Sequence, residues 1–112
     1  MIRTLRGITP QIAESAFVDP TALVIGDVSI GERSSVWPHV TIRGDVNPMH
    51  IGSETNIQDN SVLHVDGPDF PMNIGNRVTI GHSVTLHGCT IEDEALIGIG
   101  AVVLNEIGRA HV

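Results

Sequence analysis

The sequence predicts an all-β fold, a parallel β-helix built from short strands and tight corners. The first observation is a set of aliphatic residues that recur every six positions, in four runs. A period of six fits neither a helix nor a simple alternating strand, and it marks a repeat architecture. The second observation is that glycine often follows the aliphatic residue, where it permits a tight corner and a close approach of the backbone. The aliphatic positions are Val18, Val24, Ile30, Val36 and Ile42; Ile51, Ile57 and Leu63; Ile74, Ile80 and Leu86; and Ile91, Ile97 and Val103.

Each hexad is interpreted as one strand followed by a turn, and three hexads make one triangular coil. Parallel coils that stack on one another bury the aliphatic residues inside a prism, so each coil depends on its neighbours for burial. The repeat resembles the left-handed hexapeptide β-helix, and the resemblance implies left-handed coiling, an exception to the usual right-handed crossover. Residues 1–105 are therefore expected to form a single domain.

Counting three hexads per coil assigns the aliphatic residues to three faces of the prism. The longer intervals after Ile42 and Leu63 are expected to be loops that leave a corner and return in register. The first face holds Ile42, Leu63, Leu86 and Val103; the second holds Val36, Ile57, Ile80 and Ile97; the third holds Ile30, Ile51, Ile74 and Ile91.

Composition excludes several classes of function. The net charge is −7 and all six basic residues are arginine, which argues against a nucleic-acid partner and against an anionic membrane surface. No apolar run approaches the roughly 20 residues of a membrane span. The first residues lack the long apolar stretch of a secretory signal. Cys89 is the single cysteine, so no disulfide forms within the chain, and a cytoplasmic protein is the simplest interpretation.

The last residues are interpreted as foreign to the protein. A common sequencing-adapter sequence encodes Ile107 to Val112, and residue 106 would be a hybrid codon at the junction. We therefore treat residues 106–112 as a non-native tail, exclude them from fold reasoning and expect the true C-terminus to be missing.

Three histidines take defined places in the repeat. His64 and His87 each follow an inward residue of the first face, one coil apart, so they are expected to be neighbours about 4.8 Å apart. Arg43 belongs to the same column, one coil lower. His82 lies on the second face above Asp59, on the order of 15 Å from His87 along the chain. One chain is not expected to close all three histidines on one ion, whereas neighbouring chains of a trimer can.

Three neutral imidazoles with an open water position are the ligand set of a catalytic zinc ion. Such an ion lowers the pKa of its bound water to about 7 and so provides hydroxide at neutral pH. Carbon dioxide is the natural electrophile for that hydroxide in a small site, and other carbonyl compounds remain possible substrates.

The chain resembles the γ-class carbonic anhydrase family. The matching stretches are Ile42–Asp45, Asn56–Asp59, Leu63–His64 and Gly81–Cys89. The resemblance implies a homotrimer that binds one zinc or iron ion per chain at the subunit interface. It implies reversible hydration of carbon dioxide to bicarbonate by a metal-bound hydroxide. It also implies that further coils and a capping helix beyond residue 105 are missing from this chain.

By matching position, the resemblance assigns roles to seven residues. The metal ligands are His64, His82 and His87; Gln58 lies near the metal-bound water; and Arg43, Asp45 and Asp59 make polar contacts at the interface that orient the site. The chain departs from well-studied members at Val46, where they carry glutamate, and the loop after His64 has no glutamate to carry protons away. Asp66 is a weak substitute for that glutamate, so the resemblance does not imply efficient turnover.

Two other classes of function stay open. A hexapeptide acyltransferase, or a thioesterase, would act on an acyl thioester with one histidine as general base, which leaves the other two histidines unexplained. A non-catalytic trimeric scaffold would account for the absence of the proton-carrying acids. Cys89 is interpreted as a small packing residue rather than a nucleophile or a fourth ligand.

Overall fold

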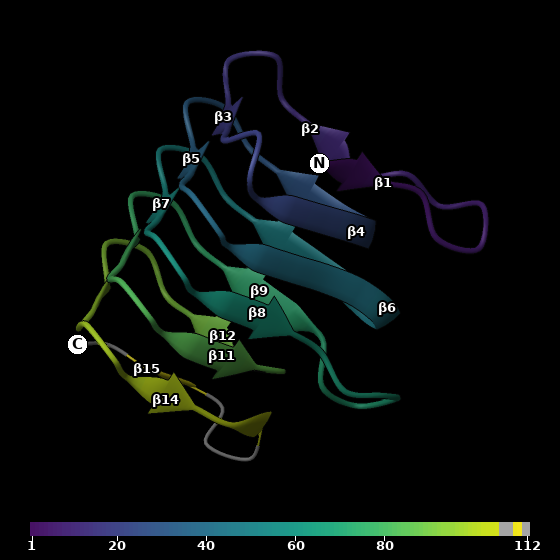
Figure 1. The fold of residues 1–112 in the computed structure, drawn as a ribbon. Helices are drawn as coiled ribbons and strands as arrows, with labels where there is room; N and C mark the ends of the chain where they lie inside the picture. The colour runs from purple at the N-terminus through teal and green to yellow at the C-terminus, as the bar shows by residue number, and fades with distance from the viewer. Residues whose placement is uncertain (106–108, 111–112) are drawn as a thin grey trace.

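The computed structural model describes residues 1–105 and the backbone of residues 109–110, and it shows a prism of stacked coils (Figure 1). The chain winds from face to face, and every pairing between strands in the described part is parallel. The predicted all-β parallel β-helix is therefore confirmed. Among the described residues, no helix is long and apolar enough to cross a membrane. The non-native tail predicted for residues 106–112 lies largely outside the described residues.

The first face carries the strands that matter most for the candidate site. Its successive strands pair in the order β1, β4, β6, β8, β11 and β14. Their bounds are β1 (Ile2–Arg3), β4 (Leu23–Ile30), β6 (Thr41–Ile51), β8 (Val62–His64), β11 (Thr85–His87) and β14 (Val102–Val103). Because β4 and β6 are long, they run on through the corner and also supply the third face.

The second face is a separate sheet, and the third face completes each coil. The second face consists of β3 (Phe17–Val18), β5 (Ser35–Val36), β7 (Asn56–Ile57), β10 (Thr79–Ile80) and β13 (Leu96–Ile97). The third face consists of β2 (Gln11–Ile12), the later halves of β4 and β6, β9 (Met72–Ile74), β12 (Thr90–Ile91) and β15 (Arg109–Ala110). All three predicted sets of stacked aliphatic residues are confirmed by the strand registers.

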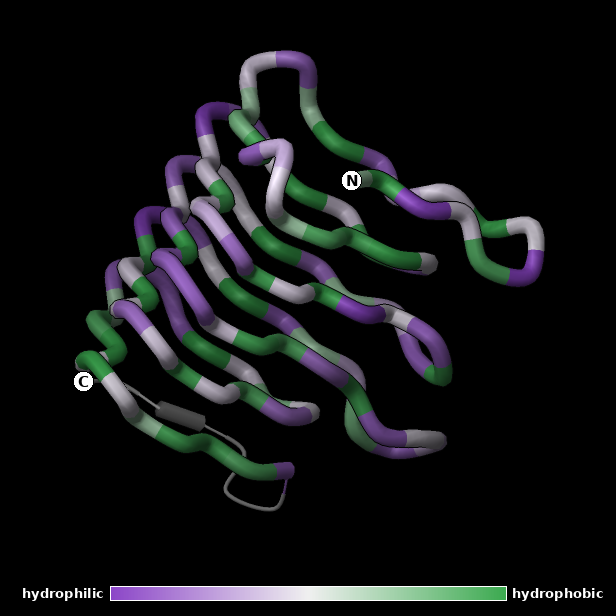
Figure 2. The backbone as a smooth tube through the Cα atoms, viewed as in Figure 1, coloured by the Kyte–Doolittle hydropathy of each residue, from purple (hydrophilic) through white to green (hydrophobic). Residues whose placement is uncertain are grey.

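The interior is a continuous column of aliphatic side chains. Ile42, Ile57 and Ile74, one from each face, expose 1% of their surface or less. Figure 2 shows hydrophobic segments recurring at the same places of successive coils. Each large aliphatic residue buried in this way contributes about 1.5–3 kcal/mol. Because the column is shared between coils, the two end coils have the least burial, and Val103 in β14, the last strand of the first face, is 8% exposed.

All departures from the six-residue spacing fall at one corner, between the first and third faces. The aliphatic spacing there is nine residues after Ile42, eleven after Leu63 and five after Leu86. The N-terminal hairpin, in which Leu5 and Ile8 pair in antiparallel fashion, and the loop between β8 and β9 extend from the prism on this same side (Figure 1). The other two corners keep a constant length in every coil from Val18 onward.

The two regular corners are made mostly by residues other than glycine. Their backbone lies in the left-handed region, which costs an L-residue on the order of 1 kcal/mol. The corner residues with positive φ are Arg33, Glu54, Arg77 and Glu94 at one corner and His39, Asn60, Ser83 and Gly100 at the other. Glycine has a different role in the repeat: a Cβ atom on Gly52 would lie 2.6 Å from the carbonyl oxygen of Gly75 in the next coil. Glycine is thus needed at position 52 because the two coils stack closely, and not because the backbone there adopts a positive φ.

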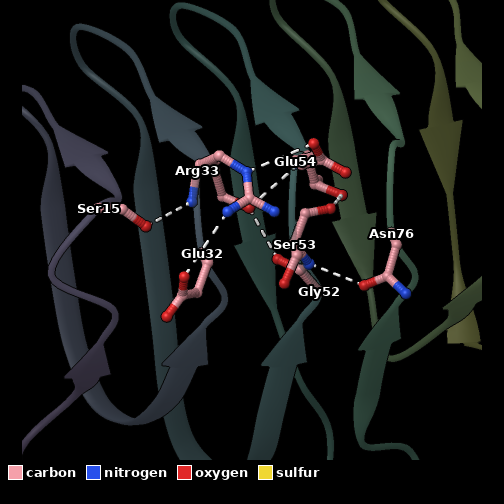
Figure 3. Close-up of polar contacts among 9 residues, drawn as sticks. Ser15, Glu32, Arg33, Gly52, Ser53, Glu54 and Asn76 are labelled. Carbon is pink, nitrogen blue, oxygen red and sulfur yellow. Dashed lines mark hydrogen bonds and ion pairs between the residues drawn. The ribbon is translucent and has the colours of Figure 1, made fainter.

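Charged side chains alternate in sign along one corner. Arg33 Nε lies 3.4 Å from Glu54 Oε2, and Arg77 Nε lies 3.1 Å from Glu94 Oε2. Figure 3 shows Arg33 reaching Glu54 on the next coil while its backbone N–H donates to Ser15 Oγ on the coil before. Exposed pairs such as these contribute about 0–1 kcal/mol each. The alternation of charge therefore matters more for the register of the coils than for the free energy of unfolding, because a shift by one coil would place like charges together.

Buried hydroxyl groups connect the coils at the corners. Ser61 Oγ donates to the carbonyl oxygen of Gly81 (2.9 Å) and accepts from the N–H of Val84 (3.1 Å). Thr55 makes the equivalent pair of bonds to Gly75 and Val78. These side chains are almost fully buried, so water cannot replace them. Each hydroxyl satisfies two backbone groups of the coil above.

We expect Ser61→Ala to destabilise the fold by about 1–3 kcal/mol, because it leaves a buried carbonyl and a buried N–H without partners. Ser15→Ala is the matched control, since Ser15 also accepts one backbone bond but on the exposed surface. The control should stay within about 0.5 kcal/mol of the parent. Urea unfolding at one fixed protein concentration measures both. Equal losses for the two variants would contradict the proposed bridging role.

Candidate metal centre

The first face brings His64 and His87 into direct contact. Parallel pairing sets Arg43 beside His64 and His64 beside His87 in consecutive coils. His64 Nδ1 lies 3.1 Å from His87 Nε2, and the ring centroids are 5.0 Å apart in an edge-on arrangement. The expected column of Arg43, His64 and His87 is therefore confirmed.

Asp45 holds the other nitrogen of His64. Its Oδ1 lies 2.8 Å from His64 Nε2, and its Oδ2 lies 3.5 Å from Arg43 Nη1. Partial burial acts to raise the pKa of Asp45, but the hydrogen bond and charge of His64, together with Arg43, outweigh it and lower that pKa below its ordinary value. An ionised Asp45 accepts a hydrogen bond from His64 Nε2–H, which leaves Nδ1 as the nitrogen that faces His87.

Asn105 holds the other nitrogen of His87. Asn105 Oδ1 lies 2.6 Å from His87 Nδ1, and Asn105 Nδ2 donates to Asp66 Oδ2 (3.1 Å). The sequence-based assignment did not include Asn105, because it follows the last hexad rather than occupying a motif position. The strand register carries a signal, since Val103 pairs with Leu86 and so brings residue 105 close to residue 87.

Arg6 is a second residue that the sequence-based assignment missed. Its Nη1 donates to the carbonyl oxygen of Asp45 (3.0 Å) across 39 residues of sequence. The N-terminal hairpin that carries Arg6 does not follow the hexad spacing, so no periodicity places it beside Asp45. The bond joins the hairpin to the backbone of the strand that supplies Asp45.

His82 lies apart from this pair, near the corner that joins the second and first faces. Its Nδ1 is 3.4 Å from Asp59 Oδ1, as the repeat predicts, and half of its side chain is exposed. His82, Asp59 and Gln58 line a cavity of about 420 Å³, together with Ser35, Trp37 and Asn56. Gln58 Nε2 donates to Asn56 Oδ1 (3.1 Å). This bond uses the amide nitrogen of the Gln58 side chain and not its amide oxygen, Oε1.

Within the described residues, one chain holds no group of three or more histidine, cysteine or acidic residues placed to bind a metal ion. The structure brings together Arg43, Asp45, His64 and His87, and separately Gln58, Asp59 and His82. This division into two groups agrees with the expectation that one chain does not close the three histidines. Their role as ligands stays a prediction.

The histidines fit a metal ion in their chemistry. Two nitrogen ligands of a tetrahedral zinc ion lie about 3.3 Å apart, given zinc–nitrogen distances of about 2.0–2.1 Å. His64 Nδ1 and His87 Nε2 are already 3.1 Å apart, so a turn of the rings, without strand movement, can direct both lone pairs at one ion. One ring nitrogen of His64 and one of His87 are hydrogen-bonded to a carboxylate or amide oxygen, and Nδ1 of His82 lies 3.4 Å from a carboxylate oxygen of Asp59. Metal-binding histidines typically have such a partner.

Known proteins resemble this chain over nearly its whole length. "Gamma carbonic anhydrase 1, mitochondrial" of Arabidopsis thaliana is 51% identical over 94% of the chain, and "Carbonic anhydrase" of Geobacillus kaustophilus is 49% identical over 97%. The model of the family described as bacterial transferase hexapeptide (six repeats) matches residues 9–44. A solved structure of a hexapeptide transferase family protein from Anaplasma phagocytophilum is 33% identical with a TM-score of 0.76, covering 92% of this chain and 74% of that one.

The chain belongs to the γ-class carbonic anhydrase family. It spans 41% of the Arabidopsis relative and 60% of the Geobacillus relative. A second solved structure, described as a putative acetyltransferase of Bacillus cereus, has a TM-score of 0.76 at 33% identity and covers 92% of this chain and 73% of that one. Members of the γ-class carbonic anhydrase family and hexapeptide transferases thus share this fold, so the fold alone does not distinguish their reactions.

Cys89 is a buried packing residue, as predicted, and it is 2% exposed. Its thiol lies 3.7 Å from Met72 Sδ in the interior. Burial raises the pKa of Cys89 to about 11, against a smaller lowering by a backbone hydrogen bond at His87. A thiol with this pKa stays protonated at neutral pH, where the thiolate is the reactive form.

We expect Cys89 in the folded protein to resist a thiol-specific reagent at about pH 8, since the thiol is both buried and protonated. Unfolding the protein in denaturant should release one reactive thiol per chain. Absorbance of the released chromophore measures the reaction over time. Rapid, full reaction of the folded protein would contradict the buried position.

Asp45 should make stability depend on pH in a defined direction. Because its folded pKa lies below its ordinary value, its ionisation stabilises the fold above that value and the contribution is lost as pH falls through the folded pKa. We therefore expect the metal-free protein to exceed Asp45→Asn in free energy of unfolding at about pH 5, and this difference to shrink below about pH 4. Urea unfolding across this range measures it, and a margin that grows in acid would contradict the proposal.

Proposed function

We propose that this chain is part of a metal-dependent carbonic anhydrase that hydrates carbon dioxide reversibly to bicarbonate, with the metal ion shared between neighbouring chains. The observation that carries the proposal is the contact of His64 with His87, each held from its other ring nitrogen by a polar partner. The names of the relatives support the same reaction. We further propose one zinc or iron ion per chain.

A homotrimer is the assembly that suits the surface of the prism. Apolar side chains stay exposed on two of the faces, and such patches commonly mark interfaces. On the first face these include Ile2, Val62, Val102 and Leu104, and on the second they include Phe17, Trp37 and Leu96. The outward row of the third face is polar throughout, with Gln11, Ser29, His50, Asn73 and Thr90. A closed three-fold assembly would cover the two apolar faces and leave the polar face in water.

In this assembly His64 and His87 of one chain and His82 of its neighbour would hold the ion. When bound, zinc or iron supplies Lewis acidity, which makes water a nucleophile at neutral pH. Asp45 and Asp59 orient His64 and His82 through the nitrogens that do not face the ion. Gln58 is fixed by its bond to Asn56, so its free carbonyl oxygen can accept a hydrogen bond from the attacking water.

Arg43 has a different role in the proposal. Its guanidinium is half exposed and pairs with Asp45 at 3.5 Å, so it balances the carboxylate that orients His64. Val46 is 53% exposed where well-studied family members carry glutamate. Because Val46 cannot accept a proton, we propose slow rather than rapid turnover.

Acyl transfer or thioester hydrolysis is the second candidate. It is favoured by the pairing of His82 with Asp59 in the cavity beside Trp37, because an oriented histidine with one free nitrogen can act as a general base. The putative acetyltransferase of Bacillus cereus shares the fold. This candidate gives no role to His64 and His87. Consumption of acetyl-coenzyme A without bound metal would favour it over carbon dioxide hydration.

We expect the anaerobically purified protein to contain about one zinc or iron ion per chain, and His82→Ala to lose most of it, because the ion then keeps two histidines of three. His50→Ala is the matched control, since His50 is exposed on the third face and pairs with Ser29. Metal analysis by mass spectrometry measures all three proteins. Full metal content in His82→Ala would contradict the proposed site.

Mixed trimers test whether the ligands come from different chains. His64→Ala and His82→Ala chains each lack a complete site, but an interface that takes His64 and His87 from one and His82 from the other is complete. Random mixing of equal amounts should restore metal at about a quarter of the interfaces. Metal that stays absent from the mixture, while each variant forms trimers, would contradict shared ligation.

A further inference from the structure

We propose that Asn105 is a positioning residue which, held by Asp66, decides which nitrogen of His87 carries the ring proton and therefore which nitrogen faces His64. The inference rests on the proposed metal site for its purpose, but the contacts behind it lie within one chain. It gives Asp66 a structural task in place of the proton-carrying one suggested by its position in the sequence.

Asp66 is fixed from several sides. Its Oδ1 accepts from the N–H of Gly67 (3.0 Å), and its carbonyl oxygen accepts from Asn47 Nδ2 (2.7 Å). Its backbone also exchanges two hydrogen bonds with Phe70. The remaining carboxylate oxygen, Oδ2, accepts from Asn105 Nδ2 at 3.1 Å. Contacts other than the one with Asn105 thus hold the backbone of Asp66 and its Oδ1 atom, and Oδ2 is the oxygen that faces Asn105.

The orientation of the Asn105 amide follows from Asp66. An ionised carboxylate only accepts hydrogen bonds, so the NH₂ group of Asn105 must face Asp66. The amide oxygen of Asn105 is then directed at His87 Nδ1, 2.6 Å away. An amide oxygen also only accepts, so His87 Nδ1 must carry the proton. A neutral imidazole has a single N–H, and His87 Nε2 therefore keeps its lone pair.

The same reasoning from Asp45 fixes His64 in the opposite form. Asp45 accepts from His64 Nε2, so His64 Nδ1 keeps its lone pair. The two lone-pair nitrogens are the pair that lies 3.1 Å apart. Two acceptors at this distance repel each other unless a cation or an extra proton lies between them. The two acidic residues, one directly and one through Asn105, therefore prepare the rings for a positive ion.

The experiment compares four versions of the chain: unmodified, Asn105→Leu, the double variant Asp66→Asn with Asn105→Asp, and the control Asn73→Leu. Leucine has the size of asparagine without its acceptor. The double variant exchanges the carboxylate and the amide, so position 105 still accepts from His87 and position 66 now donates. Asn73 lies on the exposed third face, beside His50 and on a different face from His64 and His87.

The first measurement is the proton position on His87 in the metal-free protein, from ¹⁵N chemical shifts of the ring. We expect the Nδ1–H form in the unmodified chain, the control and the double variant, and loss of that preference in Asn105→Leu. The second measurement is zinc affinity by competition with a chelator. We expect it to fall by about 10–100-fold in Asn105→Leu and to recover in the double variant.

Each outcome has one meaning. Unchanged proton position and affinity in Asn105→Leu would overturn the inference, as would a double variant that behaves like Asn105→Leu while circular dichroism shows a folded β-helix. If the unmodified chain binds no zinc, the proposed function fails, but the proton position on His87 still tests Asn105. Loss of the Nδ1–H form in Asn105→Leu alone, with rescue in the double variant, supports the positioning role.

Discussion

The parallel register between coils is the constraint on which the rest of this molecule depends. Hydrogen bonding of β8 to β11 fixes His64 beside His87, just as it fixes Leu63 beside Leu86 in the interior. A slip by one residue would move every inward side chain outward and would separate the two rings. The same ladder that buries the core therefore also brings the imidazoles together, and stability and site geometry cannot be altered independently here.

Within that frame, polar groups outside the ladder determine what the rings can do. Asp45 and Asn105 lie at opposite ends of the histidine pair and accept from its outer nitrogens. Neither belongs to a strand pairing that the aliphatic repeat specifies. The strands thus set where the imidazoles lie, and the corner residues set their chemical state. This separation explains how one fold can host both metal chemistry and acyl transfer.

Periodicity made the prism, its three faces and the stacked histidines predictable from the sequence, because every member of a column is one coil apart. It could not reveal Asn105 or Arg6, because Asn105 follows the last hexad and Arg6 lies in an irregular hairpin. The expectation that glycine makes the tight corners was wrong at positions such as Arg33 and Glu54, which adopt positive φ there. The role of Ser61 could not be predicted from periodicity either. Serine is small, and its burial at a corner does not interrupt the aliphatic repeat.

The irregular spacing at a single corner shows where this prism accommodates loops of different length. Insertions after Ile42 or Leu63 leave the inward column intact, because the chain returns to register before the next face. The other two corners carry no such extra residues from Val18 to Val103. Evolution can therefore remodel the border of the histidine pair by lengthening or shortening loops while the scaffold stays constant. Related chains can be expected to diverge in reactivity along one edge of the prism long before they diverge in shape.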